Sequence, residues 1–361
     1  MRTVLPVVLL ALLGSGCSRF VFRTDSRVDI PHPVETRVDI PPVSPSAGPV
    51  RPVVVQAGSG GSRVAIVDID GIILNAPFVG PLSVGENPVA LFREKLDAIE
   101  AERGARAVVL RVNSPGGGVA ACQAMRRDLE RFKARTGIPV VACLMDTAAG
   151  GAYYLASAAD HVIAGPATVT GGLGVILNLF NLEDLMAQFN IRPRPVKAGN
   201  LVNMGSFVRL PDEDDEHVKQ RLATEGKILQ SMADDFHQQL QADVRRSRPR
   251  VRLDGGTTFD GRIFTGAQAQ ARGLVDRLGD LDEAVQVAAQ MGCRGADAAA
   301  PQVVLYRRAN DPARSVYAVT ANIPLQGAGL LPSLPGLDRS KLPTFLSMWQ
   351  PDLTMEKLGG K

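Results

Sequence analysis

Two glycine-rich stretches in this chain have the composition of places where a backbone approaches a ligand closely. The first is N-S-P-G-G-G at 113–118, and the second is A-A-G-G at 148–151. Because glycine has no Cβ, its peptide N–H can point at negative charge that develops on a carbonyl oxygen. Taken by itself, the first stretch is better explained as a tight strand-to-helix turn. The second contains no side chain that could act as a nucleophile.

Histidine and cysteine chemistry is limited by how few of these residues the chain has. The three cysteines beyond Cys17 have no metal-ligand spacing, and we expect Cys122 and Cys143 to be small core residues. We therefore expect no metal and no other cofactor. The four histidines are His32, His161, His217 and His237.

The elements that must position these stretches alternate between strand and helix. Glycine follows several of the strands, which favours an α/β domain whose ligand site lies at the strand ends. A long helix at 212–246 has acidic residues in its first turn and basic ones in its last, as the helix dipole prefers. The sequence predicts strands at 64–73, 107–112, 139–144 and 161–164, and further helices at 87–103, 119–134, 150–159 and 281–291.

The N-terminus resembles an export signal. Arg2 precedes an apolar run at 4–13 that is far shorter than the ~20 residues of a membrane-spanning helix. L-L-G-S-G-C at 12–17 resembles a bacterial lipobox, which would make Cys17 the lipidated residue, although an ordinary signal peptide remains the alternative. Residues 18–62 are rich in Pro, Ser and Gly and predict an extended tether.

Composition excludes some classes of protein. A formal charge of +3 over 361 residues and an aromatic content of 5% argue against nucleic-acid binding, whereas a hydrophobic content of 45% is typical of a globular protein. Residues 291–361 are again rich in Pro, Leu and Gly, and we expect an irregular C-terminal segment without an assigned role.

Four motifs in order resemble the signal peptide peptidase A (SppA, protease IV) family of serine peptidases. They are N-S-P-G-G-G, A-A-G-G-A-Y-Y-L-A-S-A-A-D, T-G-G-L-G-V and D-G-R-I-F-T-G-A-Q-A-Q-A-R-G-L-V-D-R-L-G. The resemblance covers residues 63–290. It implies the family's fold, a stack of β-β-α units shared with Clp protease subunits and crotonase-type enzymes.

The resemblance also assigns site positions, and two of them carry residues without a reactive side chain. The family's serine nucleophile falls on Gly150, and its lysine base falls on Val202, whereas Lys197 matches a lysine that is not the base. A hydroxyl attacks an amide usefully only beside a base, and this chain has neither partner at these positions. The positions that the family uses for the oxyanion and the bound peptide fall on Ser114, Gly116, Gly117 and Gly151.

Other side chains could in principle replace the missing pair. Ser114 is better explained as a stabiliser or substrate contact than as a nucleophile, and Thr147 lies three positions before Gly150. Ser157 should be packed, His161 should face solvent, and Lys197 has no hydroxyl partner. The leading hypothesis is a catalytically silent, peptide-binding member of the family. The alternatives are an active peptidase with a shifted nucleophile or a residue supplied by a partner, and a crotonase-type acyl-CoA enzyme, for which Asp146 is the nearest acid.

The same hypothesis predicts location and partners. We expect a lipoprotein anchored to a bacterial envelope membrane through Cys17 and facing the periplasm. Its ligand would be an extended or signal-peptide-like peptide. The chain would form a homo-oligomer, alone or mixed with an active paralogue, and would not bind nucleic acid.

Overall fold

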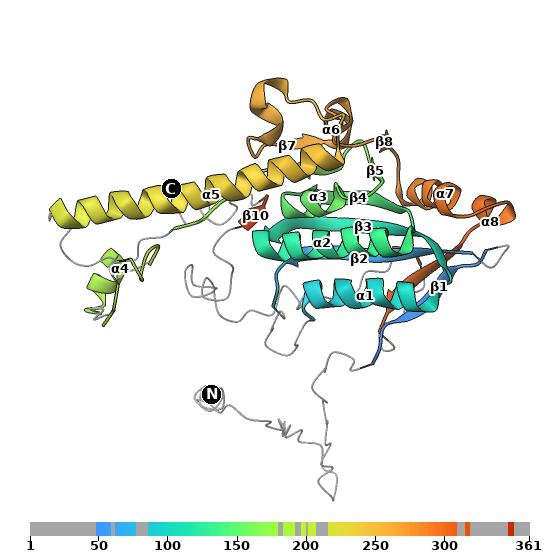
Figure 1. The fold of residues 1–361 in the computed structure, drawn as a ribbon, viewed down its shortest axis with the longest axis horizontal. Helices are drawn as coiled ribbons and strands as arrows, with labels where there is room; N and C mark the ends of the chain where they lie inside the picture. The colour runs from blue at the N-terminus through green and yellow to red at the C-terminus, as the bar shows by residue number, and fades with distance from the viewer. Residues whose placement is uncertain are drawn as a thin grey trace, which may run out of the picture. The chain divides into compact units, whose positions relative to one another are not determined.

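The computed structural model describes nine segments of the chain (Figure 1). The predicted signal peptide, Cys17 and most of the tether lie outside them. The described residues are 48–58, 62–76, 86–179, 183–191, 196–199, 201–206, 216–308, 315–317 and 346–349.

A mostly parallel sheet forms the centre of the fold and confirms the predicted α/β class. Its order is β1-β9-β2-β3-β4-β5-β8, and every neighbouring pair from β9 to β8 is parallel. The central strands are apolar runs because helices cover both faces of a parallel sheet. They are β2 (Arg63–Ile73), β3 (Ala105–Gly118), β4 (Val140–Ala149), β5 (His161–Ala164) and β8 (Arg277–Leu278).

The sheet extends past both predicted limits of the domain, 63 and 290. On one side, β1 (Arg51–Gln56) pairs antiparallel with β9 (Gln302–Arg307), and β9 pairs with β2. The V-V-L-Y run of β9 is strand-like in sequence, but it lies in a segment that we expected to be irregular. That segment also contains the short helix α8 (Ala296–Ala299) and the strand β10 (Leu346–Met348).

Two apolar clusters fill the space between the sheet and its helices. The larger packs one face against α1 (Pro88–Glu102), α2 (Val119–Thr136) and α3 (Gly151–Ala156). The smaller packs the other face against α7 (Leu281–Gly292). Asn87 caps α1 by accepting from the N–H groups of Val89 and Ala90, so this helix begins where the sequence predicts.

The glycine run at 113–118 is strand, not the predicted turn. β3 continues through Gly118 because Ile72 and Ile73 of β2 pair with Gly116 and Gly117 on one side, and β10 pairs with the same glycines on the other. The helix predicted for 150–159 is also shorter, since α3 ends at Ala156.

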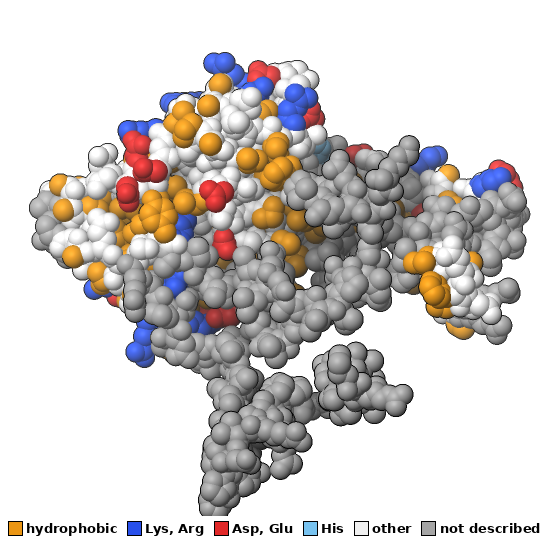
Figure 2. All heavy atoms as spheres, turned by 180° about the vertical axis from the view of Figure 1, so that it is seen from behind, with side chains coloured by type: hydrophobic (Ala, Val, Ile, Leu, Met, Phe, Trp, Pro, Cys, Tyr) orange, Lys and Arg blue, Asp and Glu red, His pale blue; other side chains and the backbone are white. Residues whose placement is uncertain are grey.

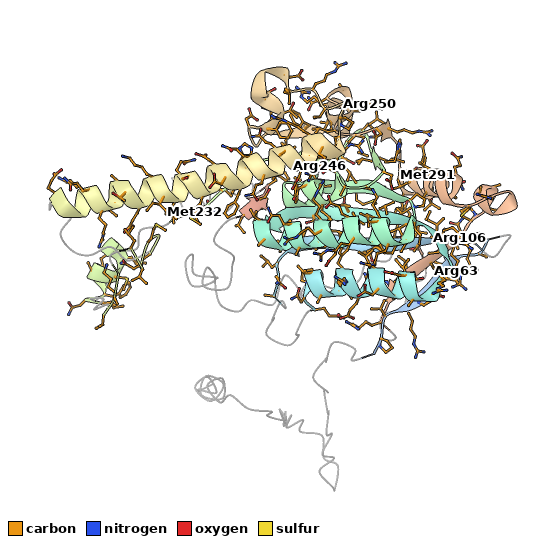
Figure 3. The ribbon with its side chains drawn as sticks, in the orientation of Figure 1. Arg63, Arg106, Met232, Arg246, Arg250 and Met291 are labelled. Carbon is orange, nitrogen blue, oxygen red and sulfur yellow. The ribbon has the colours of Figure 1, made fainter. Side chains whose placement is uncertain are left out.

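The long helix α5 (Glu216–Ser247) ends one residue later than predicted, and the predicted start at 212–215 lies outside the described residues. Only its C-terminal part enters the core, through Leu240 and Val244. Figure 3 shows Arg246 above the sheet and Met232 beyond its edge in this view. Among the described residues, no helix is both long and apolar enough to span a membrane.

Short strands and helices extend the fold beyond the carboxyl end of β4. A strand pair, β6 (Val169–Gly171) with β7 (Ile263–Thr265), extends β4. A 3-10 helix (Asp254–Phe259) and α6 (Gly266–Ala271) surround β7, and Thr265 and Gln268 form a capping box at the start of α6. The helix α4 (Glu183–Gln188) lies in the region before α5.

Candidate functional site

The glycine motifs meet at the carboxyl end of β4. The N–H of Gly150 donates to the carbonyl of Gly171 at 2.8 Å, which joins the second motif to T-G-G-L-G-V. The N–H of Gly172 donates to the carbonyl of Arg262, also at 2.8 Å, which joins the third motif to the fourth. Residues far apart in sequence therefore form one backbone framework around Gly150.

Gly150 occupies a backbone conformation that side chains disfavour. It lies between β4 and α3 with φ +55° and ψ −126°. Positive φ is readily available to glycine but strained for other residues. A Cβ on Gly150 would also lie 2.5 Å from the carbonyl oxygen of Ser347 and 2.7 Å from its carbonyl carbon. The position that should carry the nucleophile is thus filled by a peptide bond of β10.

Two more glycines surround the same carbonyl oxygen. A Cβ on Gly151 would lie 3.1 Å from it, and a Cβ on Gly116, whose φ is +104°, would lie closer still. We name Gly116, Gly150 and Gly151 the glycine cradle. The cradle holds the Ser347 carbonyl at a distance that only residues without a Cβ permit.

The two other predicted contact residues support the cradle rather than extend it. Ser114 is fully buried, and its Oγ accepts a hydrogen bond from the N–H of Gly116 at 3.1 Å. Gly117 has no space for a Cβ because the Ile73 backbone of β2 packs directly against it. Its small size is therefore explained by strand packing.

A small apolar hollow adjoins the cradle and has a volume of about 10 Å³. Phe236 and Leu240 reach it from α5, which sequence reasoning missed although their i, i+4 spacing marks one face of a helix. The thiol of Cys122 lies beside Gly151, and burial raises its pKa to about 12, so it is protonated at neutral pH. The lining is Val119, Cys122, Gln123, Gly151, Tyr154, Phe236, Leu240 and Ser347.

A buried arginine fixes the helices around this hollow. The guanidinium of Arg126, on α2, donates to the carbonyl of Tyr154 at 2.6 Å and to the Oγ of Ser157 at 2.8 Å. It also reaches the carbonyl of Asp243 on α5 at 3.3 Å. The hydroxyl of Tyr154 donates to the carboxylate of Asp243 at 2.7 Å. Ser157 is therefore packed, as expected, and α2, α3 and α5 are held together by one polar network.

The predicted base position lies on a different part of the surface. Val202 is 67% exposed in the turn at 201–205 and does not line the hollow. A Cβ on the nearby Gly205 would meet Leu229 of α5, which is seven residues, or ~10 Å of helix, from Phe236. Lys197 lies in the same region and donates to Asn203 at 2.9 Å.

The remaining candidates have structural contacts of their own. The backbone N–H of Thr147 donates to Asn113 Oδ1 at 3.3 Å, and Thr147 pairs with Val169 in the sheet. His161 is partly buried and lies 3.7 Å from the carboxylate of Asp276. Neither residue lines the hollow beside Gly150.

A second, larger cavity of about 160 Å³ shares no lining residue with the hollow. Arg111 pairs with Asp68 at 2.5 Å and donates to the carbonyl of Val316. Burial, reinforced by Asp68, raises the pKa of Asp70. Asp146, the acid weighed for acyl-CoA chemistry, faces this cavity, whose lining is Asp68, Asp70, Arg111, Asn113, Met145, Asp146 and Tyr317. No group of described residues has the makings of a metal site.

Comparison with known proteins agrees with the motif assignment. Residues 133–293 match the family model "Peptidase family S49". The chain is 26% identical to a putative signal peptide peptidase SppA of Enterococcus faecium over 64% of each protein. It is 29% identical to Protease 4 of Salmonella typhi over 64% of this chain and 35% of that protein. The matched region thus spans less than two thirds of these relatives.

Among solved structures, a serine-to-alanine mutant of the 1510-N membrane-bound stomatin-specific protease matches with a TM-score of 0.39 and 14% identity, covering 68% of this chain and 98% of that one. The family match includes the Gly150 framework, the hollow's Gly151 and Tyr154, and the fourth motif. Residues 133–293 therefore match peptidase family S49, and the chain is similar to the SppA and protease 4 peptidases.

Proposed function

We propose that this chain is a peptide-binding member of family S49 without peptidase activity of its own. The observation that carries the proposal is the glycine cradle, which grips a peptide carbonyl at the position where the family's nucleophile would stand. Glycine supplies neither a nucleophile nor a proton donor at that position.

The nearest candidate nucleophiles do not replace the serine. Cys122 is 1% exposed and protonated, whereas the thiolate is the reactive form of cysteine. Ser114 is buried and engaged with the Gly116 N–H. Removing a catalytic dyad leaves only a residual ~10³–10⁴-fold effect from binding and oxyanion stabilisation in other serine hydrolases.

We expect the chain to bind a peptide by strand addition. Gly116, Gly117 and Gly118 present one strand edge, and Ile176 presents a backbone N–H and C=O opposite it. An extended peptide between them would be held by main-chain hydrogen bonds, and side-chain pockets would set its specificity. The groove therefore suits a segment of unstructured chain, such as a signal-peptide-like ligand.

A cleavage assay with casein or a signal peptide tests the absence of activity. We expect no turnover by the natural chain and no labelling by a fluorophosphonate probe. The double variant Gly150→Ser/Val202→Lys should gain activity. Turnover by the natural chain that is lost in Ser114→Ala, or labelling of a single Ser or Thr, would show that the nucleophile has shifted.

Mixing two single variants tests whether a second copy completes the site. Val202 lies on an exposed segment, so we propose that it faces a neighbouring copy in a homo-oligomer, or an active paralogue. Gly150→Ser and Val202→Lys proteins, each inactive alone, should then give activity when mixed. Activity of the double variant that is independent of protein concentration would instead place both residues in one chain.

Exposed apolar side chains support this oligomer. Phe189, Ile191 and Val196 are 69%, 53% and 104% exposed around α4, and Figure 2 shows apolar side chains on the lobe at its right, in that region. Gathered exposed apolar surface is typical of an interface. We further propose a lipid tether at Cys17, which places the chain at a bacterial envelope membrane; Cys17→Ser should release it into the soluble fraction.

A further inference from the structure

A segment of this same chain lies in the groove. The strand β10 (Leu346–Met348) pairs antiparallel with Gly116–Gly118 of β3. On its other side, Leu346 exchanges two hydrogen bonds with Ile176, at 2.8 and 3.0 Å, and the N–H of Trp349 donates to the carbonyl of Pro115 at 2.8 Å. The segment is thus bound along both edges, as an added peptide strand would be.

The register of this segment is that of a peptide presented to the family's nucleophile. The Ser347 carbonyl lies in the glycine cradle, 2.5 Å from the place that a Cβ on Gly150 would take. The Cα of Met348, on the far side of that peptide bond, would be 2.8 Å from the same Cβ. The missing side chain at position 150 is what leaves room for the docked segment.

The Ser347 side chain fits the hollow in size but not in polarity. Ser347 is 1% exposed, and its Oγ has no hydrogen-bond partner among the described residues. The lining is mainly apolar, and the remaining space of about 10 Å³ is too small for another methylene group without rearrangement. Alanine would fill the same space without burying an unpaired hydroxyl, which is unfavourable.

We propose that Leu346–Trp349 is a resident ligand that closes the groove in cis, and that the groove's free ligands are extended peptides with alanine at the position of Ser347 between two apolar residues. The inference rests on the proposed peptide-binding function. Serine at 347 makes the resident segment a weaker ligand than such a peptide, so the groove is closed by default and opens to a better-fitting sequence.

Two variants of the full-length chain shift this equilibrium in opposite directions. Ser347→Glu places a larger, charged side chain in the apolar hollow and should release the segment. Ser347→Ala removes the unpaired hydroxyl and should tighten docking about tenfold. Ser231→Glu, at an exposed position on α5, is the matched control for the added charge.

Trp349 is the only tryptophan of the chain, so its fluorescence reports on the segment directly. It is half-buried in the docked state. We expect Ser347→Glu to shift its emission to the red and to increase quenching by acrylamide, Ser347→Ala to reduce quenching, and Ser231→Glu to match the natural chain. Unchanged emission and quenching in Ser347→Glu would overturn the inference.

Ligand binding is then measured with a dye-labelled peptide of residues 341–350 that carries Ala at position 347. Releasing the segment raises the fraction of molecules whose groove is open. The Ser347→Glu variant should therefore bind this peptide with an affinity at least about tenfold higher than that of the natural chain. The Ser347→Ala variant should bind it more weakly than the natural chain does. The same peptide with Glu at that position should not bind. If Trp349 is released and no variant binds the peptide, the proposed function and the ligand class both fail, while the docked segment stands.

Discussion

Two hollows lie near the carboxyl ends of β2, β3 and β4, and they differ in the properties that govern chemistry. The cavity around Asp68, Asp70 and Asp146 is the larger and is lined by charged side chains. The hollow at the glycine cradle is small and mainly apolar, and its polar contacts are peptide groups. The charged side chains lie at the first hollow, whereas Gly150 and Gly151, the predicted nucleophile and oxyanion positions, lie at the second.

Strand geometry produces this difference. Successive side chains of a strand point to opposite faces of a sheet. Asp68 and Asp70 are in phase with Val64 and Ile66, which pack against α7 on one face. Val67 and Ile69 alternate with them and belong to the cluster beneath α1, α2 and α3. Backbone shape, set by glycine, therefore marks the hollow at the cradle, whereas the carboxylates of Asp68 and Asp70 project toward the face that α7 covers.

The largest expected effect is on the charged cavity. Arg111→Met removes the 2.5 Å contact between the guanidinium and the buried carboxylate of Asp68, and it removes the hydrogen bond to the carbonyl of Val316. The ammonium group of Lys95, at 3.7 Å from Asp68, remains. Breaking a buried pair from one side costs about 3–5 kcal/mol of unfolding free energy. Urea denaturation should show that loss, with Arg106→Met, an exposed position on the same strand, as the control. If binding of the peptide of residues 341–350 falls as much as stability does, the two hollows are not independent.

A change in the glycine cradle should have a smaller effect on stability and a direct effect on ligand binding. Gly150→Ala forces a side chain into a positive-φ conformation, which costs about 1–3 kcal/mol, and its Cβ displaces Ser347. Gly226→Ala is the matched control, because Gly226 lies within α5 with no atom near its missing Cβ, so it should stabilise by roughly 0.5–1 kcal/mol. Thermal unfolding measures the change in stability of each variant, and Trp349 emission reports whether the segment at Ser347 is displaced. A normal Trp349 signal in Gly150→Ala would contradict the steric argument.

The smallest effect concerns the pH dependence of the charged cavity. Burial raises the pKa of Asp70 above 3.8, so the folded state binds its proton more tightly than the unfolded state does. Stability therefore falls as the pH rises from about 3.8 through the raised pKa. Asp70→Asn should match the natural chain below this window and be more stable above it, in unfolding curves recorded from pH 3 to 7. A difference that does not change with pH would rule out the titration of Asp70 as its cause.

Local sequence signals predicted much of the framework. The strand at 161–164 and the start of α1 agree with the structure because a buried apolar run and an Asn-Pro cap are local features. The motif resemblance also identified Gly116, Gly150 and Gly151 before their common contact was visible. The roles of Ser114 and Gly117 in ligand binding, and of Val202 as the base position, stay predictions.

Long-range pairing explains what the sequence did not reveal. The three glycines of β3 have low strand propensity, yet they lie in a strand because β10 pairs with all three and β2 pairs with Gly116 and Gly117. In the sequence, Phe236 and Leu240 show only that α5 has an apolar face. They line the hollow because α5 packs over α3. Neither fact can be read from the residues adjacent in the chain.

By itself, the sequence determined the α/β alternation and the family motifs, and it predicted that Gly150 and Val202 stand at the serine and lysine positions, since each depends on residue identity and local spacing. Only the tertiary structure decided that Leu346–Met348 fills the groove and that Ser347 occupies the place of the missing side chain. The reason is physical: main-chain hydrogen bonds between distant segments are largely independent of side-chain identity, so no local pattern specifies which strand edge they join.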